Sequence, residues 1–343
     1  MDQKSKGRLI KLSADVIASA SVVGDAEHRG PLGDRFDLHD PDDRFGQSTW
    51  EKAESEMQRI ALSIALKKSS LPLSSIGALY AGDLLNQCVG SAYGLLSFDI
   101  PYFGLYGACS TSAEGIILAA MGVDAKYFRY AAAVTSSHNC SAERQYRTPI
   151  EYGGQRPPSA QWTVTGAGAF ILGRCGISPS PLARITGVMP GTVIDKGISD
   201  ANNMGAAMAP AALDTLIKYF SSADASPNDF DLILTGDLGR VGSDILTDLA
   251  LAEGLDIVAV HGDCGSMIYD GLDRPDVNSG GSGCGCSASV MASHILPRIQ
   301  SGEYRRVLFL ATGAMMSPSS VQQGLSIPAI AHLIELESVG LGE

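Results

Sequence analysis

The sequence predicts an α/β protein built from two similar halves, each with a mainly parallel sheet covered by helices. Short, continuous apolar runs such as residues 76–81, 130–135 and 307–312 are typical of strands buried on both faces. These runs alternate with segments of helical periodicity. The order strand–helix–strand–helix–strand occurs once in about residues 1–180 and again in about residues 181–343. We therefore expect two duplicated βαβαβ halves, each forming one domain of the fold.

The first half begins with a strand expected at residues 14–23 and a polar surface loop at residues 24–48. Ser48 and Thr49 predict the cap of a helix over residues 50–68, whose apolar side chains recur at helical spacing. The remaining elements expected in this half are a strand at 76–81, a helix at 84–96, a strand at 102–106, a helix at 112–122, and strands at 130–135 and 163–172.

The second half follows the same pattern, starting with a helix at residues 207–219 that has Pro210 in its first turn. Residues 281–286 are rich in glycine and predict a tight loop before a helix of small residues. The other elements expected here are a strand at 231–235, a helix at 243–253, a helix at 287–298, and strands at 307–312 and 329–337.

The composition excludes several classes of function. The chain has 343 residues, 45% of them hydrophobic and 18% charged, which is typical of a globular protein with a large core. A formal net charge of −12 disfavours general binding to nucleic acid and gives no attraction to anionic lipid. An anionic ligand can still bind in a local pocket of donors, because net charge does not describe a pocket.

Cysteine usage and hydropathy indicate a soluble, reduced protein. Seven cysteines and no secretory signal peptide predict free thiols. Cys284 and Cys286 are too close together for an ordinary metal pair, so we expect no metal site. The basic N-terminus is not followed by the apolar run of a signal peptide, and no apolar stretch is long enough to span a membrane.

Cys109 is the first candidate for chemistry. It lies in the string Tyr106-Gly-Ala-Cys-Ser-Thr111, between an expected strand and an expected helix of small residues. A thiol at the positive end of a helix has a lowered pKa, which favours the reactive thiolate. The simpler alternative is a buried structural cysteine.

Longer strings resemble one family, the stage V sporulation protein AD family of the thiolase superfamily. The resemblance covers nearly the whole chain, and departures concentrate in residues 24–48 and in surface helices. The strings that carry it include Ala81-Gly-Asp-Leu-Leu-Asn-Gln-Cys88, Phe103-Gly-Leu-Tyr-Gly-Ala-Cys-Ser-Thr111, Gln161-Trp-Thr-Val-Thr-Gly-Ala-Gly-Ala169, Thr235-Gly-Asp-Leu-Gly239 and Gly280-Gly-Ser-Gly-Cys-Gly-Cys-Ser-Ala288.

The resemblance implies a thiolase-like fold with α-β-α-β-α layers, and a role in spores. The family belongs to the machinery that moves dipicolinic acid into the developing spore and out at germination. It therefore implies a dipicolinate-binding component at the forespore or spore inner membrane, beside membrane-embedded stage V sporulation proteins. It also implies a homodimer that pairs a strand near the helix after Cys109. No cofactor is expected, although Ca²⁺ can accompany dipicolinate.

The same comparison argues against catalysis. A condensing cysteine needs a base and donors that stabilise the developing charge, which the superfamily supplies as His or Asn in the second half. Here the two corresponding places read Thr235-Gly-Asp237 and Gly281-Ser-Gly-Cys-Gly285, with neither residue type. We therefore expect a protein that is not an enzyme. The alternatives are an acyltransferase that uses Cys109 with His138 or His261 as base, and a scaffold whose old active site is structural.

A dicarboxylate needs N–H donors, a cation and an apolar wall. The turn at Cys109 and the expected carboxyl ends of neighbouring strands supply such groups, with Arg144, Arg147 and Arg156 as candidate cations. Asp83 has a simpler alternative role, capping its own helix. The residues expected to bind the ligand are Cys109, Ser110, Asp83, Asn86, Ser136, Ser137, His138, Arg144 and Cys284.

Overall fold

The computed structural model describes residues 9–146, 156–272 and 277–340. Its main feature is one long mixed sheet with the strand order β10-β9-β12-β13-β8-β1-β7-β5-β3-β4. The strands are β1 (Ile10–Val23), β3 (Ile76–Gly82), β4 (Tyr102–Leu105), β5 (Tyr130–Ser137), β7 (Gly166–Arg174), β8 (Ala183–Met189), β9 (Leu232–Thr235), β10 (His261–Asp263), β12 (Arg306–Ala314) and β13 (Ala329–Glu337).

The strand order repeats, and this confirms the duplicated fold class. The first half reads β4-β3-β5-β7-β1 and the second reads β10-β9-β12-β13-β8. In both halves the first three strands are parallel and the last two run antiparallel to their neighbours. The sheet is therefore mixed, which the continuous apolar runs alone did not predict. An antiparallel pair of β1 and β8 joins the halves; their division into two domains near residue 180 stays a prediction.

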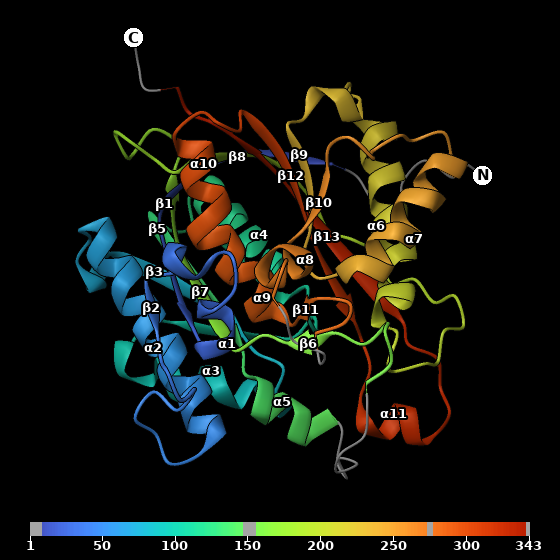
Figure 1. Cartoon of the computed structure of the whole chain (residues 1–343). Helices are drawn as coiled ribbons and strands as arrows, with labels where there is room; N and C mark the ends of the chain where they lie inside the picture. The colour runs from blue at the N-terminus through green and yellow to red at the C-terminus, as the bar shows by residue number, and fades with distance from the viewer. Residues whose placement is uncertain (1–8, 147–155, 273–276, 341–343) are drawn as a thin grey trace.

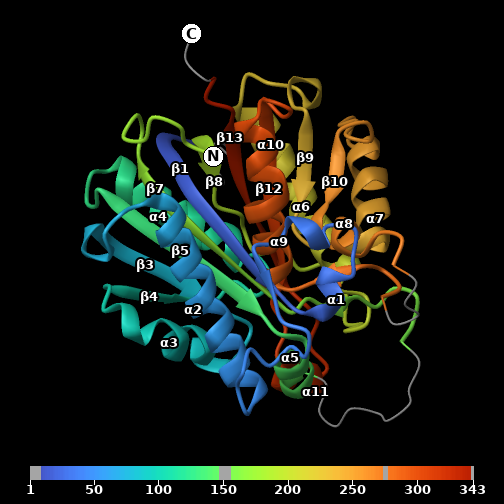
Figure 2. The same cartoon turned by 60° about the vertical axis from the view of Figure 1, so that its left-hand side comes forward.

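The helices form three layers around the two halves of the sheet. α4 (Thr111–Asp124) and α9 (Cys284–Val290) contact each other and lie between the halves (Figures 1 and 2). α2 (Trp50–Ser69) and α3 (Val89–Leu95) cover the outer face of the first half, whereas α6 (Met204–Ser222) and α7 (Gly239–Ala252) cover that of the second. α9 continues through a π-helical turn at Met291–Ile295 into α10 (Leu296–Gln300).

Three apolar cores separate these layers. In β12, Val307 and Phe309 face the central helices while Leu308 and Leu310 face the outer core of the second half, as the two-residue strand period requires. β1 instead changes faces partway along. A register shift between Val16 and Ala18 inserts an extra residue, so even-numbered side chains face the central core before it and the outer core after it.

The element predictions hold where the apolar pattern is long. Thr49 caps α2 through the Lys52 N–H, and the strands predicted near residues 76–81, 130–135, 307–312 and 329–337 are present. Pro210 lies inside α6 rather than in its first turn. The helix predicted at residues 84–96 begins only at Val89, because Gln87 and Cys88 have left-handed backbone angles.

Several short elements were not predicted. They include β8, α5 (Asn139–Tyr146), β10 and α8 (Cys264–Tyr269), and, within the expected loops, α1 (Asp25–His28), β2 (Leu38–His39), β6 (Trp162–Thr163), β11 (Gly281–Ser282) and α11 (Pro318–Gln322). α5 and α11 lie at the same end of the molecule (Figures 1 and 2). No helix in the described part of the chain has both the length and the apolar character needed to cross a membrane.

Candidate functional site

The candidate site is a small cavity at the turn that precedes α4. Its volume is ≈ 50 Å³, and Cys109 and Ser282 lie in its wall. Elements from both halves supply the rest of the wall, so the cavity lies where the two repeats meet. The other lining residues are Leu84, Tyr106, Ala108, Ala142, Glu143, Tyr146, Thr163, Met204, Ala314 and Met316.

A tight hydrogen-bonded turn positions Cys109. Gly107 N–H donates to Thr111 Oγ1 at 2.9 Å, and the Thr111 hydroxyl donates to the carbonyl of Ala108 at 2.7 Å. Ser110 Oγ donates to the carbonyl of Gly107 at 2.6 Å. Ala108 adopts a left-handed conformation (φ 52°), which bends the chain so that Cys109 lies at the start of α4.

Asp237 is a buried carboxylate that interacts with the thiol of Cys109. It follows β9, at one of the places where the sequence lacks a His or Asn. Ser282 Oγ donates to Asp237 Oδ2 at 3.1 Å and Thr312 Oγ1 donates to Oδ1 at 2.8 Å. Cys109 Sγ lies 3.7 Å from Ser282 Oγ. Cys109, Ser282 and Asp237 thus form a relay of polar contacts, and a direct hydrogen bond between Cys109 and Asp237 also affects the pKa of both groups.

The electrostatics keep this thiol protonated. Burial raises the pKa of Cys109 well above its usual value, and the negative charge of Asp237 raises it further. Burial also raises the pKa of Asp237 to about 6, although its hydrogen bonds oppose that shift. The lowered thiol pKa predicted from the helix end is therefore wrong, because burial and Asp237 outweigh the helix dipole. Proton transfer from Cys109 to Asp237 is uphill.

Neither of the two histidines considered as a base contacts Cys109. His138 is buried, with Nε2 2.8 Å from the carbonyl of Asp43 and Nδ1 accepting from the Cys140 N–H at 3.2 Å. His261 Nε2 lies 3.0 Å from Thr235 Oγ1. Burial lowers the pKa of both rings. Both are held neutral by local structure, away from the thiol.

Among the other predicted ligand-binding residues, Cys284 packs in the same cluster as Cys109. Both belong to one small apolar cluster, and Cys284 Sγ donates to the carbonyl of Ser136 at 2.9 Å. Ser110 is buried, and its hydroxyl donates to the carbonyl of Gly107 within the same turn. Ser137 Oγ donates to the carbonyl of Val164 at 2.7 Å. Of the predicted set, only Cys109 itself lines the cavity.

The remaining predicted residues lie beside the cavity rather than in it. Asp83 is buried and accepts hydrogen bonds from Leu85 and Ser91, which anchors the turn before α3. Asn86 is exposed, and its N–H donates to Gln145. Arg144 forms an ion pair with Glu51 at the start of α2. Arg147, named as a further cation, lies outside the described residues.

Arg156 is better placed than Arg144 to meet an anion. Its side chain is only 18% exposed, and it pairs with Glu143 in the cavity wall at 3.2 Å. The guanidinium lies 4.7 Å from the ring centre of Trp162, which fixes its position. Tyr106 and Tyr146 close the cavity nearby with a hydroxyl contact of 2.7 Å.

Most residues that line the Cys109 cavity were not predicted from the sequence. Glu143 and Met204 lie in strings that carry the family resemblance but were not singled out there, whereas Tyr146 and Met316 lie outside those strings. Asp237 and Ser282 had a signal, since they occupy the two positions inspected for His or Asn. No group of three or more potential metal ligands occurs in the described ranges.

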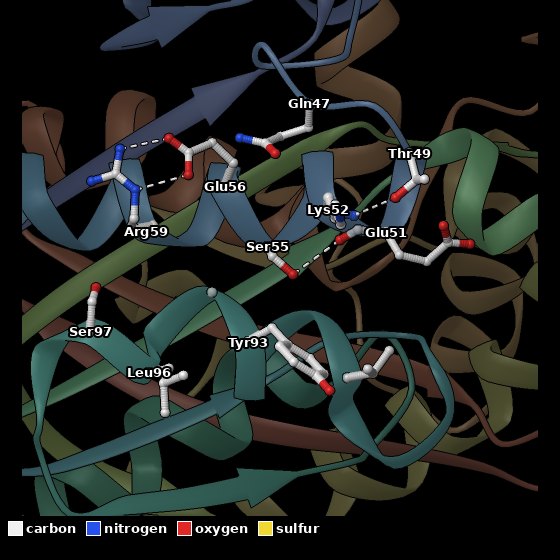
Figure 3. A pocket seen from close by; sticks show the side chains of 12 residues that line it. Gln47, Thr49, Glu51, Lys52, Ser55, Glu56, Arg59, Tyr93, Leu96 and Ser97 are labelled. Atoms are coloured by element: carbon white, nitrogen blue, oxygen red, sulfur yellow. Dashed lines mark hydrogen bonds and ion pairs between the residues drawn. The ribbon is translucent and has the colours of Figure 1, made fainter.

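A larger groove lies elsewhere, between α2 and α3 on the outer face of the first half. It has a volume of ≈ 590 Å³. Figure 3 shows Tyr93 of α3 and Leu96, which directly follows α3, opposite polar side chains of α2, including Arg59, which is paired with Glu56. None of its lining residues belongs to the Cys109 cavity.

Comparison with known proteins identifies both a family and a fold. The family described as stage V sporulation protein AD matches residues 5–337. Stage V sporulation protein AD of Bacillus subtilis is 43% identical over 327 residues, covering 95% of this chain and 94% of that protein.

Solved structures with a similar fold are enzymes. A variant of OleA from Xanthomonas campestris is 14% identical with a TM-score of 0.58, covering 97% of this chain and 100% of that chain. 3-Oxoacyl-[acyl-carrier-protein] synthase III from Aquifex aeolicus is 11% identical with a TM-score of 0.56, covering 94% and 99%. At these identities the likeness shows the thiolase-like fold alone.

Proposed function

Because the chain belongs to the stage V sporulation protein AD family, we propose that it acts in sporulation and germination as a non-catalytic receptor for dipicolinic acid. In this proposal it works at the forespore or spore inner membrane, beside membrane-embedded proteins of the same transport machinery. The observation that supports a receptor over an enzyme is the relay from Cys109 through Ser282 to Asp237. It places a carboxylate, rather than an imidazole, behind the thiol.

Two features of the cavity favour an anionic ligand. α4 and the helical run that starts with α9 both begin at the cavity, and the N-terminal end of a helix carries partial positive charge. Arg156 does not line the cavity itself, but it supplies a full positive charge next to it through its ion pair with the lining residue Glu143. A ligand carboxylate that replaces Glu143 would meet a guanidinium already held in place by Trp162.

The cavity must widen to admit such a ligand. A volume of ≈ 50 Å³ holds a few water molecules, whereas ligand pockets usually exceed about 300 Å³. Met204 and Met316 line the cavity, and methionine side chains repack easily. We therefore expect binding to displace these two side chains and the contact between Tyr106 and Tyr146.

The test is calorimetric titration with dipicolinate, with and without Ca²⁺. The wild type should bind saturably, and Cys109→Ala should retain an affinity within about threefold, because the thiol only forms part of the wall. Arg156→Gln should weaken binding by about tenfold or more, since a charge-assisted hydrogen bond contributes roughly 1.5–3 kcal/mol.

Arg144→Gln is the matched control. Its side chain is 58% exposed and paired with Glu51, so this variant should bind like the wild type. Equal losses in both arginine variants would point to a general electrostatic effect and not to this site. Absence of binding, together with acylation of Cys109 by a thioester, would establish the acyltransferase instead.

A further inference from the structure

A second cluster of buried polar groups lies between α2, α3 and the carboxyl ends of β3 and β5. Its members come from α2, α3, α5, β5 and the turn after β3, and they are almost fully buried. None of them lines the Cys109 cavity. They are Glu54, Gln58, Asp83, Ser91, Ser136 and Ser141.

One amide links two carboxylates in this cluster. Ser91 donates to Asp83 Oδ2 through its backbone N–H at 2.7 Å and its hydroxyl at 2.6 Å. Ser136 donates to Glu54 Oε1 at 3.0 Å. Gln58 Nε2 donates to both hydroxyls, at 2.9 Å to Ser91 and 2.7 Å to Ser136. The two carboxylates therefore share a continuous network.

The packing also brings the two acids close to one point. A Cβ atom added to Gly90 would lie 3.2 Å from Asp83 Cγ and 3.4 Å from Glu54 Cγ. Ser141 Oγ donates a hydrogen bond to the second carboxylate oxygen of Glu54, Oε2, at 2.7 Å. The acids therefore lie on either side of the same glycine of α3.

No positive charge compensates this pair. Within the described ranges, no Lys, Arg or His side chain donates to either carboxylate. The titratable groups that face the pair are acids as well: Cys88 and Tyr102 beside Asp83, and Cys284 of α9 beside Glu54. Two ionised carboxylates in such surroundings would carry a large desolvation penalty.

The network also lacks a donor. Gln58 Oε1 is buried without a hydrogen-bond partner, whereas its amide nitrogen is fully used. A protonated carboxyl group would add one hydrogen-bond donor to the cluster. Consistent with this, burial and then the charge of Asp83 raise the pKa of Glu54 to about 8, and burial raises the pKa of Asp83 as well.

We propose that Glu54 and Asp83 form a proton-binding site that holds one shared proton at neutral pH, and that loss of this proton loosens the turn beside the Cys109 cavity. The proton is taken from water and returned to water, with no other bond made or broken. The proton-binding site does not depend on the proposed receptor function, whereas the effect on ligand affinity rests on it.

The turn after Asp83 links the two sites. Asp83 Oδ1 accepts the Leu85 N–H at 2.9 Å, and Leu84 lines the cavity. The carbonyl of Leu84 accepts the hydroxyl of Tyr146 at 2.7 Å, which holds Tyr146 over the cavity. Repulsion between two ionised carboxylates acts at the base of this turn, so deprotonation should free Tyr146, help the cavity to widen and strengthen ligand binding.

The first experiment is infrared difference spectroscopy of the wild type between about pH 6 and about pH 9. The carbonyl stretch of a protonated carboxyl group should disappear over this range with a midpoint near pH 8. The Glu54→Gln variant should lose this signal, whereas Asp83→Asn should shift its midpoint to lower pH, because Glu54 stays buried while the charge of Asp83 is removed. Persistence of the full signal in Glu54→Gln, or its absence in the wild type, would overturn the proton-binding site.

Thermal unfolding provides an independent measurement. A carboxyl whose pKa is raised by folding stabilises the native state most at low pH, and this stability is lost as the pH rises from 4.5 to about 8. Glu54→Gln should therefore flatten the fall in Tm over that range. Glu27 and Asp237 also have raised pKa values, so the relevant quantity is the difference between wild type and variant.

Glu56→Gln is the matched control on the same helix. Glu56 is paired with Arg59 outside the cluster, so this variant should keep the wild-type slope. In titrations with dipicolinate, wild-type affinity should rise above about pH 8 while the Glu54→Gln affinity stays constant. If no dipicolinate binds at all, the receptor function fails while the infrared result still decides the proton site.

Discussion

Asp237 lies two residues after β9 and sets the protonation state of Cys109. Its carboxylate accepts hydrogen bonds from Ser282 of β11 and Thr312 of β12, which hold it in place. The same carboxylate raises the pKa of the thiol. The negative charge of Asp237 therefore adds to the effect of burial in keeping the thiol protonated.

At this scale we predict that Asp237→Asn increases the rate at which iodoacetamide alkylates Cys109 at about pH 8. Removing the charge lowers the thiol pKa, and each pKa unit changes the thiolate fraction about tenfold. Peptide mass spectrometry distinguishes Cys109 from the other cysteines. Asp244→Asn, an exposed position of α7, is the control. Equal rates in wild type and Asp237→Asn would mean that Asp237 does not control the thiol.

At the scale of elements, close backbone contacts seat α9 against the sheet. A Cβ atom on Gly285 would lie 2.2 Å from the carbonyl oxygen of Gly166 and 2.7 Å from the backbone nitrogen of Ser137. These atoms belong to the ends of β7 and β5, so the first turn of α9 rests directly on both strands. Backbone atoms cannot move aside as a flexible side chain can.

We therefore predict that Gly285→Ala destabilises the protein by about 1–3 kcal/mol or more, measured by denaturant unfolding. Gly340→Ala is a suitable control, because no atom lies within 4 Å of the added Cβ. It should stay within about 0.5 kcal/mol of the wild type. A similarly small effect of Gly285→Ala would show that α9 can shift without cost.

At the scale of the whole molecule, β4 is an open edge. It is the last strand of the sheet and pairs only with β3 among the described residues. Phe103 is 50% exposed, and Tyr102 and Tyr106 are exposed beside it. An open strand with apolar side chains favours pairing with another chain.

The expected homodimer stays a prediction, and this edge provides its test. Sedimentation equilibrium should give twice the chain mass of 35.8 kDa for the wild type. Phe103→Glu should yield monomers, because it places a charge in the interface. Tyr127→Glu changes an 81% exposed side chain on another surface and should leave the dimer intact. A monomeric wild type would remove the basis for this arrangement.

The sequence by itself determined the fold class, the family and the position of Cys109 between a strand and a helix. Long apolar runs such as residues 307–312 report strands directly, because their signal lies within a few neighbouring residues. β8 and α5 were missed for the same reason. β8 is interrupted by half-buried polar residues, and α5 has few apolar ones.

Only the tertiary structure decided which groups meet. Asp237, Ser282 and Thr312 lie far apart in the chain, yet they converge because β9 and β12 are adjacent parallel strands and the loop before α9 passes over their carboxyl ends. The same packing turned His138 toward Asp43 and paired Arg144 with Glu51. Local periodicity records the neighbours of a residue along the chain, whereas burial, charge pairing and pKa depend on neighbours across layers.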